Sequence, residues 1–166
     1  MFRSIEDFLA TWGHEQDATH TLYAKLTDAS LAQPVVEGGR TLGFIAWHTV
    51  QTLGEMMARV GLKVDAPGEH DPVPAHAAEI VAALDRASAS LLEQIKTTWT
   101  DATLLEEDDM YGERWKRGTT LHALVAHHAH HRGQITVLMR QAGIAPSGVY
   151  GPAKEEWAAF GMEPLP

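Results

Sequence analysis

The chain has 166 residues and a formal net charge of −9 at pH 7, from 13 Lys and Arg residues against 22 Asp and Glu residues. Nucleic acids and anionic lipids both bind proteins through cationic side chains, so this charge argues against both kinds of partner. The chain has no cysteine. Disulfides, thiolate catalysis and sulfur-ligated metals are thereby excluded, and a transition metal would need His, Asp or Glu as ligands.

The length fits one domain, which we expect to span residues 1–166. Hydrophobic residues make up 45% of the chain, a normal value for a globular protein. The start of the chain lacks the long apolar segment of a signal peptide, and no apolar run approaches the roughly 20 residues that cross a bilayer. We therefore expect a cytoplasmic protein with a hydrophobic core.

Apolar residues at helical spacing predict a first helix from about residue 4 to residue 30. Ser4 followed by Asp7 resembles the start of a capping box. The apolar stripe has a polar gap around Glu15 and Thr19. We interpret this gap as a solvated stretch of the helix, with a polar cavity facing it as the alternative.

Thr41 is a suitable N-cap for a second helix, which we expect to end near Gly61 because glycine suits the position after a helix end. The segment 63–74 is rich in Pro, Gly and Asp. It is longer than a tight turn between antiparallel helices needs, which permits a crossover connection. Pro74 lies in the first turn of a predicted third helix that continues to Trp99.

The acidic and aromatic segment 101–118 has no predicted structure. A fourth helix is predicted over about residues 121–141, ended by Gly143. The remaining residues, 144–166, form a C-terminal extension with a short helical stretch near residues 155–160. Four long helices and no alternation typical of strands predict an all-α fold, a four-helix bundle.

The fourth predicted helix carries four histidines within five residues, His127, His128, His130 and His131. Residues three or four apart share one side of a helix, so three pairs could present two imidazoles to one ion: 127/131, 127/130 and 128/131. We prefer His127 with His131 because this pair shares its arc with leucines that should face the bundle interior. We expect His128 to be packed and His130 to project toward the wetter side.

His48 lies in the second predicted helix, on an arc with Phe44 and Ile45 and then with Thr52 and Glu55. A lone histidine on a partly apolar face is more often a hydrogen-bonded core residue than a metal ligand. However, two imidazoles need a third ligand, and no other histidine lies on a clearly apolar helical stripe. Three imidazoles with a free fourth position make a metal site of the open, catalytic kind.

Other motifs give weaker indications. Glu55 is a candidate base or hydrogen-bond partner in such a site. Trp115 and Trp157, which lie outside the main predicted helices, are candidates for the wall of a pocket. Gly-rich phosphate loops, the Gly-x-Ser-x-Gly elbow and the His-Glu-x-x-His motif do not occur. A solvated or packed histidine cluster without a metal is the competing interpretation.

The combination of His48 with the stretch His127-x-x-x-His131-Arg-Gly-Gln resembles the DinB/YfiT-like metalloprotein superfamily. The later segment 149–152, Val-Tyr-Gly-Pro, is similar to the C-terminal region of that family. The resemblance implies helices in an up-down-down-up order and commonly a homodimer. It also implies a divalent ion held by His48, His127 and His131, with water completing the coordination. The family name derives from DNA-damage-inducible genes and does not imply DNA binding.

Members of this family with assigned activities are similar in using the metal for thiol-dependent transfer or isomerisation, or for hydrolysis. We therefore expect a metal-dependent enzyme that transfers a low-molecular-weight thiol to a small-molecule electrophile. Zinc, nickel and iron are the candidate metals, since all accept imidazole ligands. A metal-dependent hydrolase and a non-catalytic metal-binding stress-response module are the alternatives.

Overall fold

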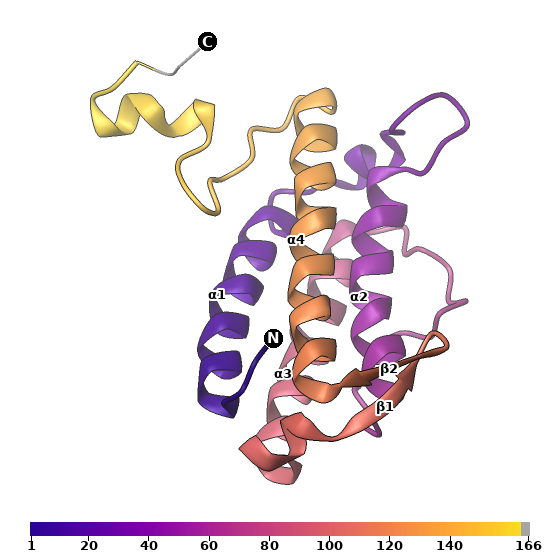
Figure 1. The fold of residues 1–166 in the computed structure, drawn as a ribbon. Coiled ribbons are helices and arrows are strands. Elements are labelled where there is room, and N and C mark those ends of the chain that lie inside the picture. Colours follow the sequence, from indigo (N-terminus) through magenta and orange to yellow (C-terminus); the bar gives the residue numbers. More distant parts are fainter. Residues whose placement is uncertain (164–166) are drawn as a thin grey trace.

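The computed structural model describes residues 1–163, which form mostly helices and one small sheet (Figure 1). The elements in chain order are α1 (Ile5–Tyr23), η1 (Asp28–Ala32), α2 (Leu42–Ala58), α3 (Ala77–Thr98), η2 (Asp101–Leu105), β1 (Glu107–Met110), β2 (Glu113–Lys116), α4 (Arg117–Gln141) and η3 (Lys154–Phe160). The four predicted long helices are present. The prediction of a purely α-helical fold is wrong only in that it lacks the β1–β2 sheet.

Helix α1 begins as predicted, because Oγ of Ser4 accepts a hydrogen bond from the backbone N–H of Asp7 at 3.2 Å. It ends at Tyr23, however, and not near residue 30. The backbone N–H of Ser30 donates to Oγ1 of Thr27 at 3.2 Å, which starts the separate short 3-10 helix η1. Short polar side chains compete with the helical backbone in this way, so the predicted first helix is divided.

The start of α2 agrees with its prediction, and the starts of α3 and α4 differ by a few residues. Oγ1 of Thr41 caps α2 by accepting from the N–H of Phe44 at 3.2 Å. Helix α3 begins after Pro74, at Ala77, whose N–H donates to Oδ1 of Asp28 at 2.8 Å. Helix α4 begins at Arg117, four residues before the predicted start.

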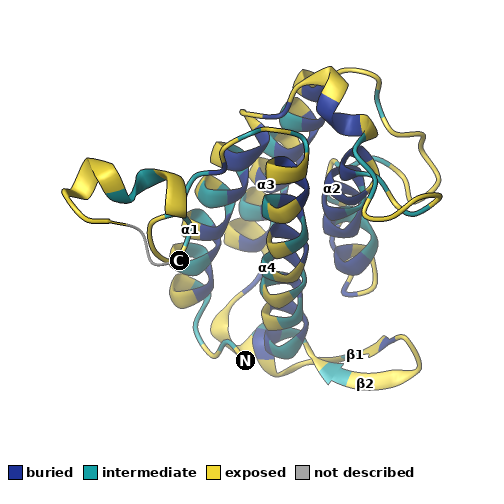
Figure 2. Cartoon of the chain, turned by 90° about the horizontal axis from the view of Figure 1, so that it is seen from above, coloured by how far each residue is buried: buried dark blue, intermediate teal, exposed yellow. Residues whose placement is uncertain are grey.

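The long helices surround a common core. Helix α4 packs against α1 and α2, and α3 packs against the same two helices. Figure 2 shows buried residues on the inward faces of the helices and exposed residues on the hairpin and the tail. The largest fully buried side chains include Trp12, Tyr23, Leu53 and Leu84. Helix α4 therefore has two different neighbours, and this arrangement decides where its polar residues lie.

The segment 101–118, for which no structure was predicted, forms η2 and an antiparallel hairpin. The hairpin loop consists of Tyr111 and Gly112, whose φ angles are 60° and 88°. Two consecutive residues with positive φ make the kind of two-residue turn that matches the twist of paired strands. Arg117, at the start of α4, forms ion pairs with Glu106 at 2.7 Å and with Asp108 at 2.8 Å. The acidic residues of this segment therefore tie the hairpin to α4.

The tail contains the short helix η3, which agrees with the helical stretch predicted near residues 155–160. Figure 1 shows this helix to one side of the four long helices. Arg140 of α4 holds it through two hydrogen bonds to Glu155, of 2.7 and 2.9 Å. Residues 164–166 of the predicted C-terminal extension lie outside the described residues. Within residues 1–163, no helix is long and apolar enough to span a membrane.

Candidate metal centre

Three histidines from two helices meet between α2 and α4. His48 comes from α2, and His127 and His131 come from successive turns of α4. One ring nitrogen from each residue lies within 4.8 Å of the others. The Nε2 atoms of His127 and His131 are 3.1 Å apart. The ring of His48 has its centre 5.3 Å from that of His127 and 5.0 Å from that of His131. The structure thus brings together the three histidines that the sequence singled out.

The local packing of His48 explains its position. Phe44 lies one turn earlier on α2, and its ring stacks on the His48 ring with centres 6.3 Å apart and planes 11° apart. The guanidinium of Arg40 covers the same Phe44 ring at 5.0 Å from its centre. His48 therefore has an aromatic neighbour on its own helix while its ring faces the two histidines of α4.

The other two histidines of the run take the places predicted for them. His128 is buried, with 1% of its surface exposed, and packs edge-on against Trp12 with ring centres 5.0 Å apart. His130 is exposed. Of the three pairs that helical spacing allows, 127/131 is the pair that lies together with His48. His128 and His130, which the other two pairs would need, lie outside this group because each is one residue, about 100° of helical rotation, away from a member of it.

Burial keeps the three imidazoles uncharged. Burial, together with the neighbouring histidines, lowers the pKa of His127 to about 4. Burial also lowers the pKa of His48 and of His131 below the usual histidine value. A histidine must be neutral to bind a metal ion, so all three are in the binding form at neutral pH.

The donor set fits a divalent transition metal. Two imidazole nitrogens on one tetrahedral zinc ion would lie ~3.3 Å apart, because each zinc–nitrogen bond is about 2.0–2.1 Å long. The 3.1 Å between the Nε2 atoms of His127 and His131 is close to this distance. Nδ1 of His127 is buried without a hydrogen-bond partner among residues 1–163. Three imidazole ligands also leave a coordination position for a small molecule, as in open sites.

A cavity of about 590 Å³ lies beside the histidines. Its wall combines residues of α2, the 59–76 connection, the hairpin and α4. The lining residues are His48, Gln51, Thr52, Glu55, Met56, Arg59, Glu69, Tyr111, Trp115, Ala123 and His127. Trp115 lines this cavity as predicted, whereas Trp157 is not among the lining residues. Glu55 also lines it, and its role as a base or hydrogen-bond partner stays a prediction. The size of the cavity suits a small molecule.

Three of the lining residues form a connected group that links the hairpin loop to α2. Oε1 of Glu55 accepts a hydrogen bond from Nε of Arg59, and Oε2 accepts one from the Tyr111 hydroxyl, both at 2.7 Å. The Arg59 guanidinium also lies over the Tyr111 ring, 4.3 Å from its centre. Sequence reasoning missed Arg59 and Tyr111. The two-residue turn at Tyr111 and Gly112 was the available signal, but its sequence is not one of the usual hairpin turns.

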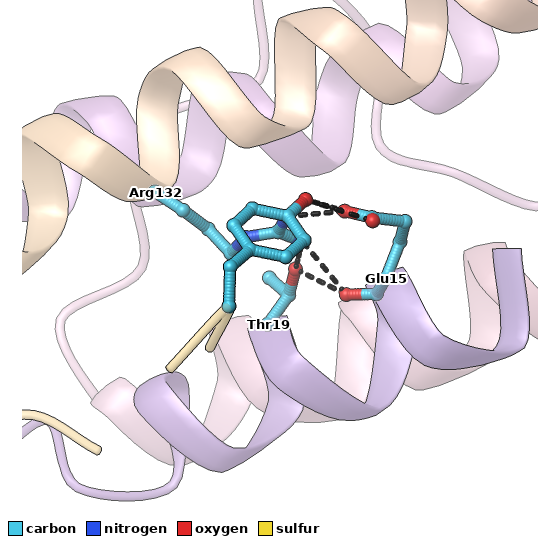
Figure 3. A network of polar contacts seen from close by, with 4 residues as sticks. Glu15, Thr19 and Arg132 are labelled. Carbon is cyan, nitrogen blue, oxygen red and sulfur yellow. Dashed lines mark hydrogen bonds and ion pairs between the residues drawn. The ribbon is translucent and has the colours of Figure 1, made fainter. Parts of the chain in front are cut away.

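A second polar cluster lies between α4 and α1, on another side of α4 from the histidines (Figure 3). Arg132 is 2% exposed and forms an ion pair with Glu15, which is 4% exposed. Arg132 also donates to Oγ1 of Thr19 at 3.0 Å and to the Tyr150 hydroxyl at 2.6 Å. That hydroxyl donates to the Glu15 carboxylate at 2.8 Å. The preferred interpretation of the polar gap in the first helix as a solvated stretch is therefore wrong, because the gap faces a buried arginine.

Comparison with known proteins places the chain among relatives of the same size and fold. The sequence profile of the DinB family matches residues 1–165. The chain is 47% identical over 163 residues to the uncharacterized protein YrdA of Bacillus subtilis, and the match covers 98% of each chain. It also superposes on the crystal structure of a DinB-like protein from Bacillus cereus. That match has a TM-score of 0.88 and 37% identity, and it covers 90% of this chain and 100% of the other. The chain therefore belongs to the DinB family.

Proposed function

We propose that this protein binds one divalent transition metal through His48, His127 and His131 and uses it to transfer a small-molecule thiol to an electrophile. One observation carries the proposal: three neutral imidazoles converge within 4.8 Å at the wall of a cavity of about 590 Å³. A metal site that served only to stabilise the fold would be expected to be closed and to have four protein ligands. This one is open on the side of the cavity.

The donor set decides what chemistry a metal would supply. Because the imidazoles are uncharged, a bound metal keeps its full positive charge and would lower the pKa of a thiol or water that occupies the open position. Zinc, nickel and iron(II) all suit imidazole ligands, and their availability decides which is bound. A protein without cysteine has no sulfur of its own to offer. In the proposed reaction the thiol loses its proton to solvent water, its sulfur forms a bond to an electrophilic carbon, and the leaving group departs with its bonding electrons.

The residues around the cavity favour thiol transfer over hydrolysis. A water nucleophile benefits from a carboxylate that is free to accept its proton. Both oxygens of Glu55 already accept hydrogen bonds, from Arg59 and from Tyr111. A thiol is more acidic than water and depends less on such a base. Met56, Ala123 and Trp115 supply apolar wall against which the rest of a small molecule can pack.

The first experiment measures metal content. Tag-free wild-type protein is expected to carry about one equivalent of a divalent metal, and His127→Ala is expected to lose it. His122→Ala, an exposed histidine of the same helix, is the matched control and should keep the metal. Helical circular dichroism should persist after chelation, since a site of this open kind is not expected to hold the fold together. Unfolding on chelation would instead support a non-catalytic structural ion, and no binding of zinc, nickel or iron would refute the proposal.

The second experiment distinguishes thiol transfer from hydrolysis. The metal-loaded protein is incubated with cysteine or glutathione and a bimane electrophile, and separately with nitrophenyl esters without a thiol. We expect thiol transfer that chelation abolishes and that His127→Ala lacks. Ester hydrolysis without thiol transfer would favour the hydrolase. Neither activity with any thiol or ester would favour a metal-binding module.

We also propose a helix order, a cellular location, a class of partner and an oligomeric state for this protein. The long helices run in an up-down-down-up order, which the long 59–76 connection between α2 and α3 supports. The protein is cytoplasmic and acts on a small molecule without nucleic acid or membrane as a partner, as its charge of −9 suggests. It forms a homodimer, as the family resemblance implies, and sedimentation velocity tests this directly.

A further inference from the structure

Gln134 connects two histidines of α4. Its Oε1 lies 2.8 Å from Nδ1 of His131, and its Nε2 lies 3.3 Å from Nε2 of His130. The three side chains occupy neighbouring turns of one helix, at spacings that place them on the same side. Gln134 is half-buried and His130 is exposed. The chain of contacts thus runs from the solvent side of α4 to the three-histidine group.

The chemistry of the amide decides where the proton of His131 lies. An amide oxygen can only accept a hydrogen bond and an amide nitrogen can only donate one. With Nε2 of Gln134 donating to His130, the oxygen faces His131, and Nδ1 of His131 must be the nitrogen that carries the proton. The lone pair of His131 is then on Nε2, the atom that lies 3.1 Å from Nε2 of His127. The reverse orientation of the amide would place the proton of His131 on the nitrogen that faces the site.

His127 provides the contrast within the same site. Its Nδ1 is buried and has no hydrogen-bond partner among residues 1–163. Its Nε2 has a partner only inside the site, Nε2 of His131 at 3.1 Å, so no group outside the three histidines selects its tautomer. The hydrogen bond at the second nitrogen of a histidine sets which nitrogen is free to bind a metal. Of the two histidines that α4 contributes, His131 is the one with such a partner.

We propose that Gln134 is a positioning residue that holds His131 in the tautomer whose Nε2 can bind a metal, and that His130 fixes the orientation of the Gln134 amide. The inference rests on the proposed metal function, but its effect on the tautomer exists in the metal-free protein too. The inference gives Gln134 and His130 a role in metal binding, although neither residue would contact the metal.

The first test measures zinc affinity by competition with a chromophoric chelator. Gln134→Leu removes the acceptor and is expected to weaken zinc binding by about 10–100-fold, the usual effect of losing a hydrogen-bond partner of a metal-bound histidine. Gln134→Glu keeps an acceptor at the same place and is expected to bind zinc at least as tightly as the wild type. His130→Ala should weaken binding less than Gln134→Leu, because the amide is then free to turn but is still present.

The second test reads the tautomer directly in the metal-free protein. Long-range proton–nitrogen correlation spectra of ¹⁵N-histidine-labelled protein should show the proton of His131 on Nδ1 in the wild type and in Gln134→Glu. In Gln134→Leu the proton should shift toward Nε2. Gln134→Met, whose side chain has a similar length, replaces Gln134→Leu if that variant loses helical circular dichroism. A purely structural role of Gln134 would leave the tautomer unchanged.

The outcomes separate this inference from the proposed function. A wild-type His131 with its proton on Nε2 would overturn the inference, and so would a folded Gln134→Leu that binds zinc as tightly as the wild type. A wild type that binds no metal would overturn the proposed function alone, and the tautomer of His131 would then decide the inference by itself.

Discussion

Helix α4 carries two polar clusters that face different neighbours, and they differ in how their polar atoms are satisfied. On the side of α1, Arg132 meets Glu15, Thr19 and the Tyr150 hydroxyl, so a cation, an anion and two hydroxyl groups satisfy one another. On the side of α2, three bases of the same kind converge. Ring nitrogens this close can share a proton, as His127 and His131 do at 3.1 Å, or together bind a cation.

The difference shows how a structural cluster can be told from a binding site. The Arg132 cluster contains opposite charges, and Arg132 and Glu15 are almost completely buried although Tyr150 is 69% exposed. The two charges neutralise each other and need no further ligand. The histidine cluster has no charge of either sign at neutral pH and opens to a cavity. An unpartnered nitrogen does not distinguish the clusters, because Nδ1 of His127 and Nε of Arg132 both lack a hydrogen-bond partner among residues 1–163. Burial alone does not separate the two cases. Complementarity of the groups does.

The largest expected effect follows from breaking the Arg132 cluster. Arg132→Leu leaves the Glu15 carboxylate buried without its partner and should lower the free energy of unfolding by about 3–5 kcal/mol, measured by urea denaturation. Replacing both residues by leucine should recover most of this loss, because no buried charge then remains. Two results would show that the buried ion pair does not stabilise the fold in this way. One is an equal loss of unfolding free energy in the single and double variants, and the other is an Arg132→Leu variant as stable as the wild type.

A second, smaller effect concerns the stability of the metal-free protein as a function of pH. His127 has a pKa of about 4 in the folded state and the ordinary value of 6.5 when unfolded. Between these values the unfolded chain binds more protons than the folded one, so stability should fall as the pH is lowered from about 6.5 toward 4. Well above pH 6.5 both states are neutral at this residue and the effect vanishes.

Urea denaturation in the presence of a chelator, at several pH values between 7 and 4.5, measures this slope. His127→Gln should make it shallower without removing it. His128 is buried and its pKa is also well below the ordinary value, so it contributes in the same direction. Equal slopes for the wild type and His127→Gln would contradict the lowered pKa of His127. The acidic groups with lowered pKa values, such as Glu155, lose their effect at lower pH and do not obscure the comparison.

Features that depend on residues close together on one helix could be predicted from the sequence. The pairing of His127 with His131 follows from spacing on α4, as do the burial of His128 and the exposure of His130. The N-caps at Ser4 and Thr41 follow from short side chains that bond to the backbone nearby. Each of these depends on residues only a few positions apart.

Features that depend on distant residues could not be predicted in this way. Glu15 and Arg132 are separated by 117 positions, and nothing local to Glu15 indicates that an arginine faces it. The solvated interpretation of that stretch failed for this reason. The hairpin was not predicted for a different reason. Tyr111 adopts a positive φ that a tyrosine rarely has. The hydrogen bond from its hydroxyl to Glu55 spans 56 positions. The cavity that it helps to form was therefore not visible in the sequence.

The smallest expected effect tests whether the tail belongs to the structural cluster. Tyr150→Phe removes the hydroxyl that donates to Glu15 and accepts from Arg132, and should lower the free energy of unfolding by about 1–2 kcal/mol, since hydrogen bonds to charged groups are the stronger ones. Tyr111→Phe is the matched control, because its hydroxyl also donates to a glutamate. Both tyrosines are exposed, Tyr111 at 54% and Tyr150 at 69%, so the two variants differ in the acceptor. The Glu55 side chain is 21% exposed, against 5% for the Glu15 side chain, and water can replace the lost bond at Glu55. A change of less than about 0.5 kcal/mol is therefore expected for Tyr111→Phe. Equal losses of stability in the two variants would contradict this expectation. They would mean that burial of the glutamate does not change how much a tyrosine–glutamate hydrogen bond contributes. A loss confined to Tyr150→Phe would make the segment around Tyr150 part of the folded unit that α1 and α4 form.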